Sequence, residues 1–102
     1  MDEPLMNTTP RDNPAASRFE LPLGDRLAIA DYILTPGAIA FTHTEVPPEF
    51  QGRGLASKLI KFALDAARDR NLSVTPHCEA VASYIARHPG YQDLLEPAFR
   101  KP

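Results

Sequence analysis

The sequence predicts an α+β domain with the element order βββαβα, in which a mixed, mostly antiparallel sheet packs against two helices. Three observations predict this fold class. Extended segments separated by tight turns fill residues 17–46, an amphipathic helical pattern covers residues 54–70, and a second one runs from about Cys78 to His88. With 102 residues, 43% of them hydrophobic, the chain has room for one small core.

The first two strands are expected to form a hairpin. The segments SRFEL and RLAIADYIL are separated by a turn that contains Gly24 and Asp25, and Gly at the first central position is typical of a type II′ turn. The turn TPG, at residues 35–37, places Pro and Gly at the central positions of a type II turn. A third strand, AIAFTHTEV, is therefore expected at residues 38–46.

This third strand changes from apolar to polar along its length, as expected of a strand that leaves the core and enters a site. Regular pairing should stop at Pro47 and Pro48, because proline cannot donate ladder hydrogen bonds. Strict alternation of side chains predicts two faces, one with Ile39, Phe41, His43 and Glu45 and the other with Ala40, Thr42, Thr44 and Val46.

The segment GLASKLIKFALDAARDR, residues 54–70, is the clearest helix in the sequence. Asn71 is placed to adopt the left-handed conformation that ends it, and LSVT then predicts a short buried strand. The first helix shows an apolar stripe of Leu55, Leu59, Phe62, Ala63 and Ala66, and the second helix one of Cys78, Val81, Ala82 and Ile85.

The folded domain is predicted to span residues 17–95, with a C-terminal tail at 96–102. Residues 1–16 are rich in proline and lack aromatic residues, which predicts a flexible tail. They also lack the basic start and apolar centre of a secretory signal, and the chain has a single cysteine. The simplest compartment is therefore the reducing cytoplasm.

Charge and hydropathy argue against two kinds of partner. A net charge of -2 disfavours nucleic acid, because phosphate backbones are met with an excess of Lys and Arg. No apolar run approaches the roughly 20 residues that a membrane helix needs. A cationic small substrate is compatible with this composition.

The stretch PPEFQGRGLASKL, residues 47–59, places two glycines before a helix, as phosphate-binding loops do. A Walker loop requires Gly where Ser57 stands and a hydroxyl where Leu59 stands, so a nucleotide triphosphatase is not expected. A dinucleotide loop belongs to a βαβ unit, whereas three antiparallel strands precede this loop. A third pattern, Q/R-x-x-G-x-G/A, is met in full from Gln51 to Ala56.

That third pattern comes with further matching residues: HTEVP before the loop, and one cysteine that opens the next helix before YIARHP. In this combination the chain resembles the small YjdJ-type members of the GNAT superfamily, which are acyl-CoA-dependent N-acyltransferases. The resemblance covers about residues 17–95. It implies a compact GNAT-like fold in which the strand before the loop splays from its neighbour and coenzyme A lies in the gap.

The resemblance implies that backbone amides of the loop hold the pyrophosphate of acetyl-CoA or coenzyme A, and that the preceding strand offers backbone to the pantetheine arm. A helix start suits this role, because it carries about half a positive charge and unpaired N–H groups. In the alternative, the glycines only shape the turn and Arg53 is solvated. The implied cofactor-binding residues are Thr44, Val46, Gln51, Gly52, Arg53, Gly54, Leu55, Ala56 and Ser57.

Acyl transfer needs a neutral amine, and a lysine-like amine with a pKa of about 10.4 is almost fully protonated at pH 7. Glu45 is the first candidate base and His43 the second, unless they serve only as surface hydrogen-bonding groups. Cys78 offers a covalent route, because a helix start favours the nucleophilic thiolate; alternatively it is an inert core residue. The resemblance makes Tyr84 a candidate acid for the departing thiolate, with packing as the alternative.

A metal site is not expected from His77, Cys78 and His88, because Cys78 and His88 lie too far apart on one helix. Compared with full-length GNAT enzymes, the resemblance implies that two helices between the first strands and further C-terminal strands, which help bind the acceptor amine, are absent from this chain, so the acceptor side is expected to be open. Two hypotheses remain: an acetyl-CoA-dependent N-acetyltransferase for a small amine or a protein lysine, or a coenzyme A binding or regulatory module without significant turnover. A monomer or weak homodimer is expected.

Overall fold

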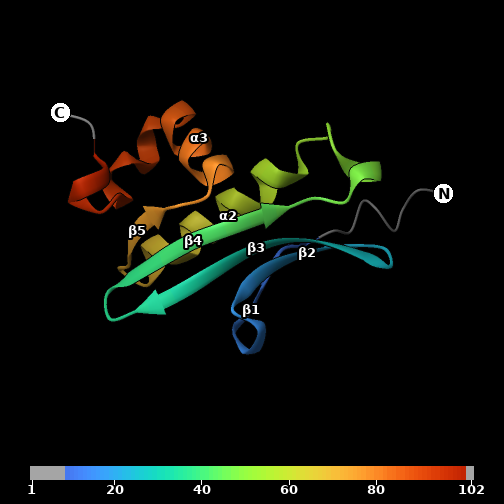
Figure 1. Cartoon of the computed structure of the whole chain (residues 1–102), viewed down its shortest axis with the longest axis horizontal. Coiled ribbons are helices and arrows are strands. Elements are labelled where there is room, and N and C mark those ends of the chain that lie inside the picture. Colours follow the sequence, from blue (N-terminus) through green and yellow to red (C-terminus); the bar gives the residue numbers. More distant parts are fainter. Residues whose placement is uncertain (1–8, 101–102) are drawn as a thin grey trace.

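The computed structural model describes residues 9–100, which form one five-stranded sheet with two α-helices and several short 3-10 helices (Figure 1). The strands are β1 (Arg11–Asn13), β2 (Arg18–Leu23), β3 (Arg26–Thr35), β4 (Ala38–Glu45) and β5 (Ser73–Pro76); the α-helices are α2 (Leu55–Asp69) and α3 (Glu79–Arg87). The 3-10 helices are η1 (Pro14–Ala16), η2 (Pro48–Phe50), η3 (Pro89–Leu94) and η4 (Pro97–Phe99).

The strands follow the order of the sequence across the sheet. The pairs from β1 to β4 are antiparallel, and β4 pairs with β5 in parallel. The predicted α+β class with a mostly antiparallel sheet is confirmed, and the predicted order βββαβα corresponds to β2 through α3. Strand β1 is an additional element.

The turns and helix ends follow from local chemistry. Gly24 and Gly37 have φ values of +69° and +76°, which is the left-handed region that type II′ and type II turns assign to glycine. Gly54 precedes α2 with φ of +76°, and Asn71 follows it with φ of +57°. Both predicted helices are therefore found within a residue of their expected limits.

One face of the sheet carries the core. The helices α2 and α3 contact this sheet and each other (Figure 1). Among residues 9–100 no α-helix covers the opposite face of β2 and β3, and Ile33 there is 57% exposed. The strand residues buried under the helices are Phe19, Leu21, Leu23, Ala28, Ala30, Tyr32, Ile39, Phe41 and Val74.

The prediction of a flexible tail over residues 1–16 is wrong for its second half. Residues 11–13 form β1, which pairs with β2, and residues 14–16 form η1. The part of this prediction that concerns residues 1–8 lies outside the described residues.

Strand β1 is held by charge rather than by apolar contacts. The carboxylate of Glu20 on β2 is only 2% exposed and accepts hydrogen bonds from Arg11, Asn13 and Arg18 at 2.8, 2.9 and 2.7 Å. The Asn13 and Arg18 hydrogen bonds, with the Arg11 guanidinium, lower the pKa of Glu20 to about 2. The polar segment Arg11–Asn13 is therefore held as a strand because its side chains donate hydrogen bonds to the buried carboxylate of Glu20.

A β-bulge in β4 overturns the predicted alternation of faces beyond Phe41. Tyr32 pairs with Phe41 but the neighbouring Asp31 pairs with His43, so the register skips Thr42. Directly opposite residues of paired strands share a face.

The bulge moves the polar half of β4 to new faces. Thr44 lies opposite the buried Ala30 and therefore faces the helices, whereas Glu45 lies opposite Ile29 on the uncovered face, together with His43. The expectation that His43 and Glu45 share the face of Ile39 and Phe41 is therefore wrong, and the one extra residue is the reason.

The C-terminal segment continues the fold past the predicted limit at residue 95. Leu95 bridges to Val74 on the free edge of β5, and the N–H of Glu96 donates to the Val74 carbonyl at 2.9 Å. Residues 97–99 then form η4. The segment up to residue 100 therefore packs on β5 instead of leaving as a tail.

Candidate functional site

The central feature of the site is the edge of β4 beyond the end of β5. Their parallel pairing ends at Phe41 and Pro76, and the last bond runs from the Cys78 N–H to the Phe41 carbonyl at 3.0 Å. Strand β4 continues to Glu45 along β3, as Figure 1 shows. Among residues 9–100, no strand pairs with β4 on its β5 side beyond this point. Strand β5 ends at Pro76, so the edge of β4 beyond Phe41 is open on this side; we call this opening the gap, and Cys78 lies at its closed end, the apex.

The glycine loop lies at the open end of β4, directly before α2. Gly52 and Gly54 both have left-handed φ values, +82° and +76°, and no side chain caps the start of α2. A left-handed residue followed by helical ones turns successive N–H groups toward a common point, which forms an anion-binding concavity. The first turn of α2 thus presents unpaired donors.

A pocket of about 130 Å³ joins the loop to the end of β4. It is lined by seven of the nine residues predicted to bind a cofactor, and also by Phe50, which the sequence reasoning did not single out. Its lining residues are Val46, Phe50, Gln51, Gly52, Gly54, Leu55, Ala56 and Ser57.

Two side chains of the loop are placed by specific contacts. The amide of Gln51 donates to the main-chain carbonyl of Val46 at 3.0 Å, which closes the loop onto β4. The guanidinium of Arg53 lies over the Phe50 ring, 5.6 Å from its centroid. Within the described part of the chain no carboxylate pairs with Arg53, so its charge is available to an anion.

Cys78 and Thr44 meet at the apex of the gap. Thr44 Oγ1 and Cys78 Sγ lie 3.2 Å apart, within hydrogen-bonding distance, and both residues are half-buried. Cys78 is the N-cap residue of α3, as expected from its place before the helical pattern.

The two candidate bases lie together on the other face of β4. His43 Nε2 and Glu45 Oε1 are 3.2 Å apart, and their side chains are 57% and 64% exposed. The bulge therefore gives β4 two chemically different sides at its polar end: a thiol and a hydroxyl toward the helices, and an imidazole and a carboxylate toward solvent.

Tyr84 belongs to an aromatic cluster in the core. It is 4% exposed, stacks on His88 with 3.9 Å between ring centroids, and lies 5.9 Å from the Tyr91 ring. Tyr91 in turn donates to Asp65 on α2 at 2.7 Å. Among residues 9–100 no hydrogen bond or ring contact joins Tyr84 to the loop or to Cys78, so the structure places it in core packing and not in the gap.

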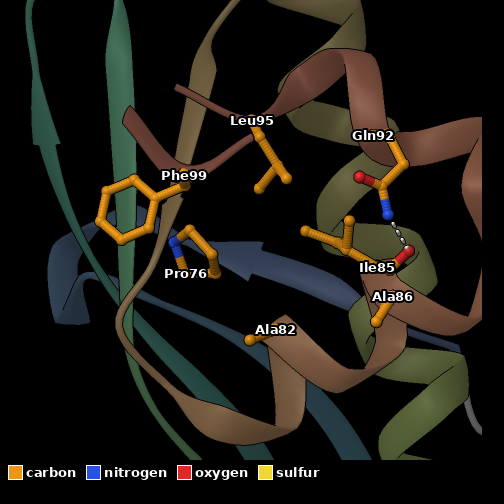
Figure 2. Close-up of a pocket in the computed structure, with 7 residues that line it drawn as sticks. All are labelled: Pro76, Ala82, Ile85, Ala86, Gln92, Leu95 and Phe99. Carbon is orange, nitrogen blue, oxygen red and sulfur yellow. Dashed lines mark hydrogen bonds between the residues drawn. The ribbon is translucent and has the colours of Figure 1, made fainter. Parts of the chain in front are cut away.

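A second pocket, of about 160 Å³, lies beyond β5 (Figure 2). It is mainly apolar, and Gln92 on its rim donates to the Ile85 carbonyl at 3.0 Å. The sequence reasoning did not single it out, because its wall is completed by Phe99 of η4, a residue that was placed in the expected C-terminal tail. Its lining residues are Pro76, Ala82, Ile85, Ala86, Gln92, Leu95 and Phe99.

Residues 9–100 contain no group of three or more His, Cys, Asp or Glu side chains that could hold a metal ion. None of the helices described in that range is long and apolar enough to cross a membrane.

A mixed sheet whose parallel strand pair opens beside a glycine-rich helix start defines the GNAT-like class of folds. A family model described as GCN5-related N-acetyl-transferase matches residues 18–94. The chain belongs to this family, as the resemblance of its loop and strand motifs implied.

Known relatives agree with this assignment. The chain is similar to Protein NATD1 of Xenopus tropicalis, with 31% identity over 72% of this chain and 69% of the relative. Protein NATD1 of Mus musculus is 37% identical over 54% of this chain and 52% of the relative, so the match spans about half of the mouse protein.

A solved structure shows the same fold. The NMR structure of a GCN5-like putative N-acetyltransferase from Staphylococcus aureus matches with a TM-score of 0.69 and 25% identity. The match covers 88% of this chain and 89% of the other.

Proposed function

We propose that the protein transfers an acetyl group from acetyl-CoA to an amine. The observation that carries this proposal is the gap beyond the end of β5, with the uncapped start of α2 at its open end and Cys78 at its apex. Family members generally use acetyl-CoA, and the donors in this gap are of the kind that such a cofactor requires.

The cofactor would lie along β4 from the loop to the apex. The diphosphate carries negative charge, so it would bind the N–H groups of residues 52–57 at the helix start, where the macrodipole favours anions. Arg53, which pairs with no carboxylate of residues 9–100, adds a positive charge there. The pantetheine arm would follow the free edge of β4 past Val46 and Thr44, which directs the thioester toward Cys78.

Two routes of transfer are compatible with this placement. In direct transfer, Glu45 or His43 would remove a proton from the acceptor ammonium, and the free amine would attack the thioester carbonyl. In covalent transfer, Cys78 would take the acetyl group first and pass it to the amine. Because Glu45 and Cys78 lie on opposite faces of β4, both groups can serve the same reaction from different sides.

The acceptor would be a small amine or a protein lysine. No α-helix in the described part of the chain covers the face that carries His43 and Glu45, and both side chains are exposed to solvent. An open face of this kind admits a macromolecular acceptor as readily as a small one. We propose a cytoplasmic location, with a monomer or weak homodimer as the working unit.

Calorimetry with coenzyme A tests the cofactor site. We expect binding that weakens about threefold to tenfold in Arg53→Gln, since one charged contact is lost. Arg87→Gln, an exposed arginine at the far end of α3, is the matched control and should bind as the unaltered protein does. Absence of binding at millimolar coenzyme A would contradict the proposal.

Turnover is tested by release of free coenzyme A thiol from acetyl-CoA in the presence of polyamines or lysine peptides. Release that depends on the amine supports an N-acetyltransferase. If coenzyme A binds but no amine in the panel causes thiol release, the result would instead favour a coenzyme A binding module. The open acceptor side is compatible with this alternative.

A further inference from the structure

The polar contact at the apex of the gap assigns a role to a side chain that lies outside the loop motif. Thr44 was expected to contribute only its backbone. The structure instead places its hydroxyl 3.2 Å from the sulfur of Cys78, at the point where the pairing of β4 with β5 ends.

This contact depends on the bulge at Thr42. In a regular strand Thr44 would face away from Phe41; the extra residue turns it to the same side as Phe41 and the helices. The backbone of Cys78 is fixed separately, through its N–H bond to the Phe41 carbonyl at 3.0 Å and through the bond from Ala82 N–H to the Cys78 carbonyl at 3.0 Å. The sulfur and the hydroxyl are thus brought together by two independent constraints on their backbones.

We propose that Thr44 is a positioning residue that orients the Cys78 sulfur toward the gap and donates a hydrogen bond to it when the thiol is ionised. This inference rests on the proposed function and deepens its covalent route. A hydrogen bond to an ionised acceptor is roughly twice as strong as one between neutral groups, so the hydroxyl favours the thiolate over the thiol. The thiolate is the nucleophilic form of cysteine.

The chemistry balances without a further reactant. The Cys78 thiol loses its proton to solvent, the sulfur forms a bond to the acetyl carbonyl carbon, and the bond from that carbon to the coenzyme A sulfur breaks. The coenzyme A thiolate takes a proton from solvent. In the second half the amine nitrogen bonds to the carbonyl carbon, the Cys78 thioester breaks, and the amine proton restores the thiol. Thr44 keeps its own proton throughout.

The test measures the alkylation of Cys78 by iodoacetamide against pH, followed by intact mass. In Thr44→Val, which keeps the shape and removes the hydroxyl, we expect the pH of half-maximal rate to rise by about one unit, which corresponds to the loss of one hydrogen bond to a charged group. Thr44→Ser retains a hydroxyl and should restore the original profile. Thr35→Val, the same substitution at an exposed position at the end of β3, should leave the profile unchanged.

Acetylation of Cys78 by acetyl-CoA, followed as a mass increase of one acetyl group, should slow about tenfold in Thr44→Val. An unchanged alkylation profile in Thr44→Val, or a shifted one that Thr44→Ser does not restore, would overturn the role of Thr44. If Thr44→Val fails to fold, Thr44→Ala gives the same comparison. If the protein fails to bind coenzyme A, the proposed function is contradicted. Alkylation needs no acetyl-CoA, so the alkylation result would still decide the role of Thr44.

Discussion

The side-chain amide of Gln51 donates a hydrogen bond to the main-chain carbonyl of Val46, with 3.0 Å between nitrogen and oxygen. This bond joins the first residue of the loop motif to the end of β4, across the 3-10 helix that separates them. It fixes where the glycine loop stands relative to the strand edge. Gln51 thus helps to define the shape of the pocket by holding the loop against the end of β4.

Replacing Gln51 with alanine should weaken coenzyme A binding about fivefold, because the loop loses one hydrogen bond that holds it in place. Calorimetry measures the affinity directly. Gln92→Ala is a matched control, since Gln92 also donates to a main-chain carbonyl at 3.0 Å, that of Ile85, away from the loop. Equal losses in the two variants would show that Gln51 has no particular role in the loop.

Gly54→Ala should destabilise the fold through its backbone. Gly54 has φ of +76°, where an L-residue costs about 1 kcal/mol, although a Cβ there would meet no atom within 4 Å. We expect Tm to fall by about 5 °C. Gly90 has equal space and no positive φ, so Gly90→Ala should leave Tm unchanged or slightly higher. Matching Tm values for the two variants would rule out strain at Gly54.

Much of this backbone could be predicted from the sequence because local chemistry determines it. Glycines at 24, 37 and 54 adopt left-handed conformations that the neighbouring turn or helix start requires, and Asn71 ends α2 for the same reason. The loop and its pocket follow from these positions. Such features need only a few adjacent residues to be specified.

The bulge could not be predicted, because it is a property of two strands. Whether Thr42 pairs or bulges depends on its register against Asp31 and Tyr32. The residues of β4 alone do not indicate that register. The consequence for the site is large: His43 and Glu45 change sides, and the Thr44 side chain meets Cys78. Strand β1 was missed for a similar reason, since its partner is a buried carboxylate and not an apolar stripe.

Glu20→Gln should lower the free energy of unfolding by roughly 2 kcal/mol at pH 7, and this effect should depend on pH. The pKa of Glu20 is lowered from 4.5 to about 2 by Asn13, Arg18 and Arg11. A lowered pKa means that ionisation favours the folded state, fully above pH 4.5, and that this contribution is lost as the pH falls toward about 2. Urea unfolding of both proteins across this range measures the difference.

The effect of Glu20→Gln on stability is expected to decrease as the pH is lowered. The difference in free energy of unfolding between the unaltered protein and Glu20→Gln should be constant from pH 7 to about 5 and should decrease steadily below pH 4.5. If this difference in free energy of unfolding stayed constant down to pH 2, the Glu20 charge would not stabilise β1. Asp25→Asn, in the exposed hairpin turn, controls for the general loss of a negative charge.

Variants of Glu45 and Cys78 separate the two routes of acetyl transfer, because the two side chains lie on opposite faces of β4. If transfer is direct, Glu45→Gln should lower kcat about a hundredfold, the usual contribution of a general base, and leave KM for acetyl-CoA nearly unchanged. Cys78→Ala should then retain most of its turnover. If transfer is covalent, Cys78→Ala should lose both the acetyl adduct and turnover, whereas Glu45→Gln should still form the adduct. Asp25→Asn again serves as the control, and full activity in both variants would exclude the covalent route and Glu45 as the base, which leaves His43 as the remaining candidate base.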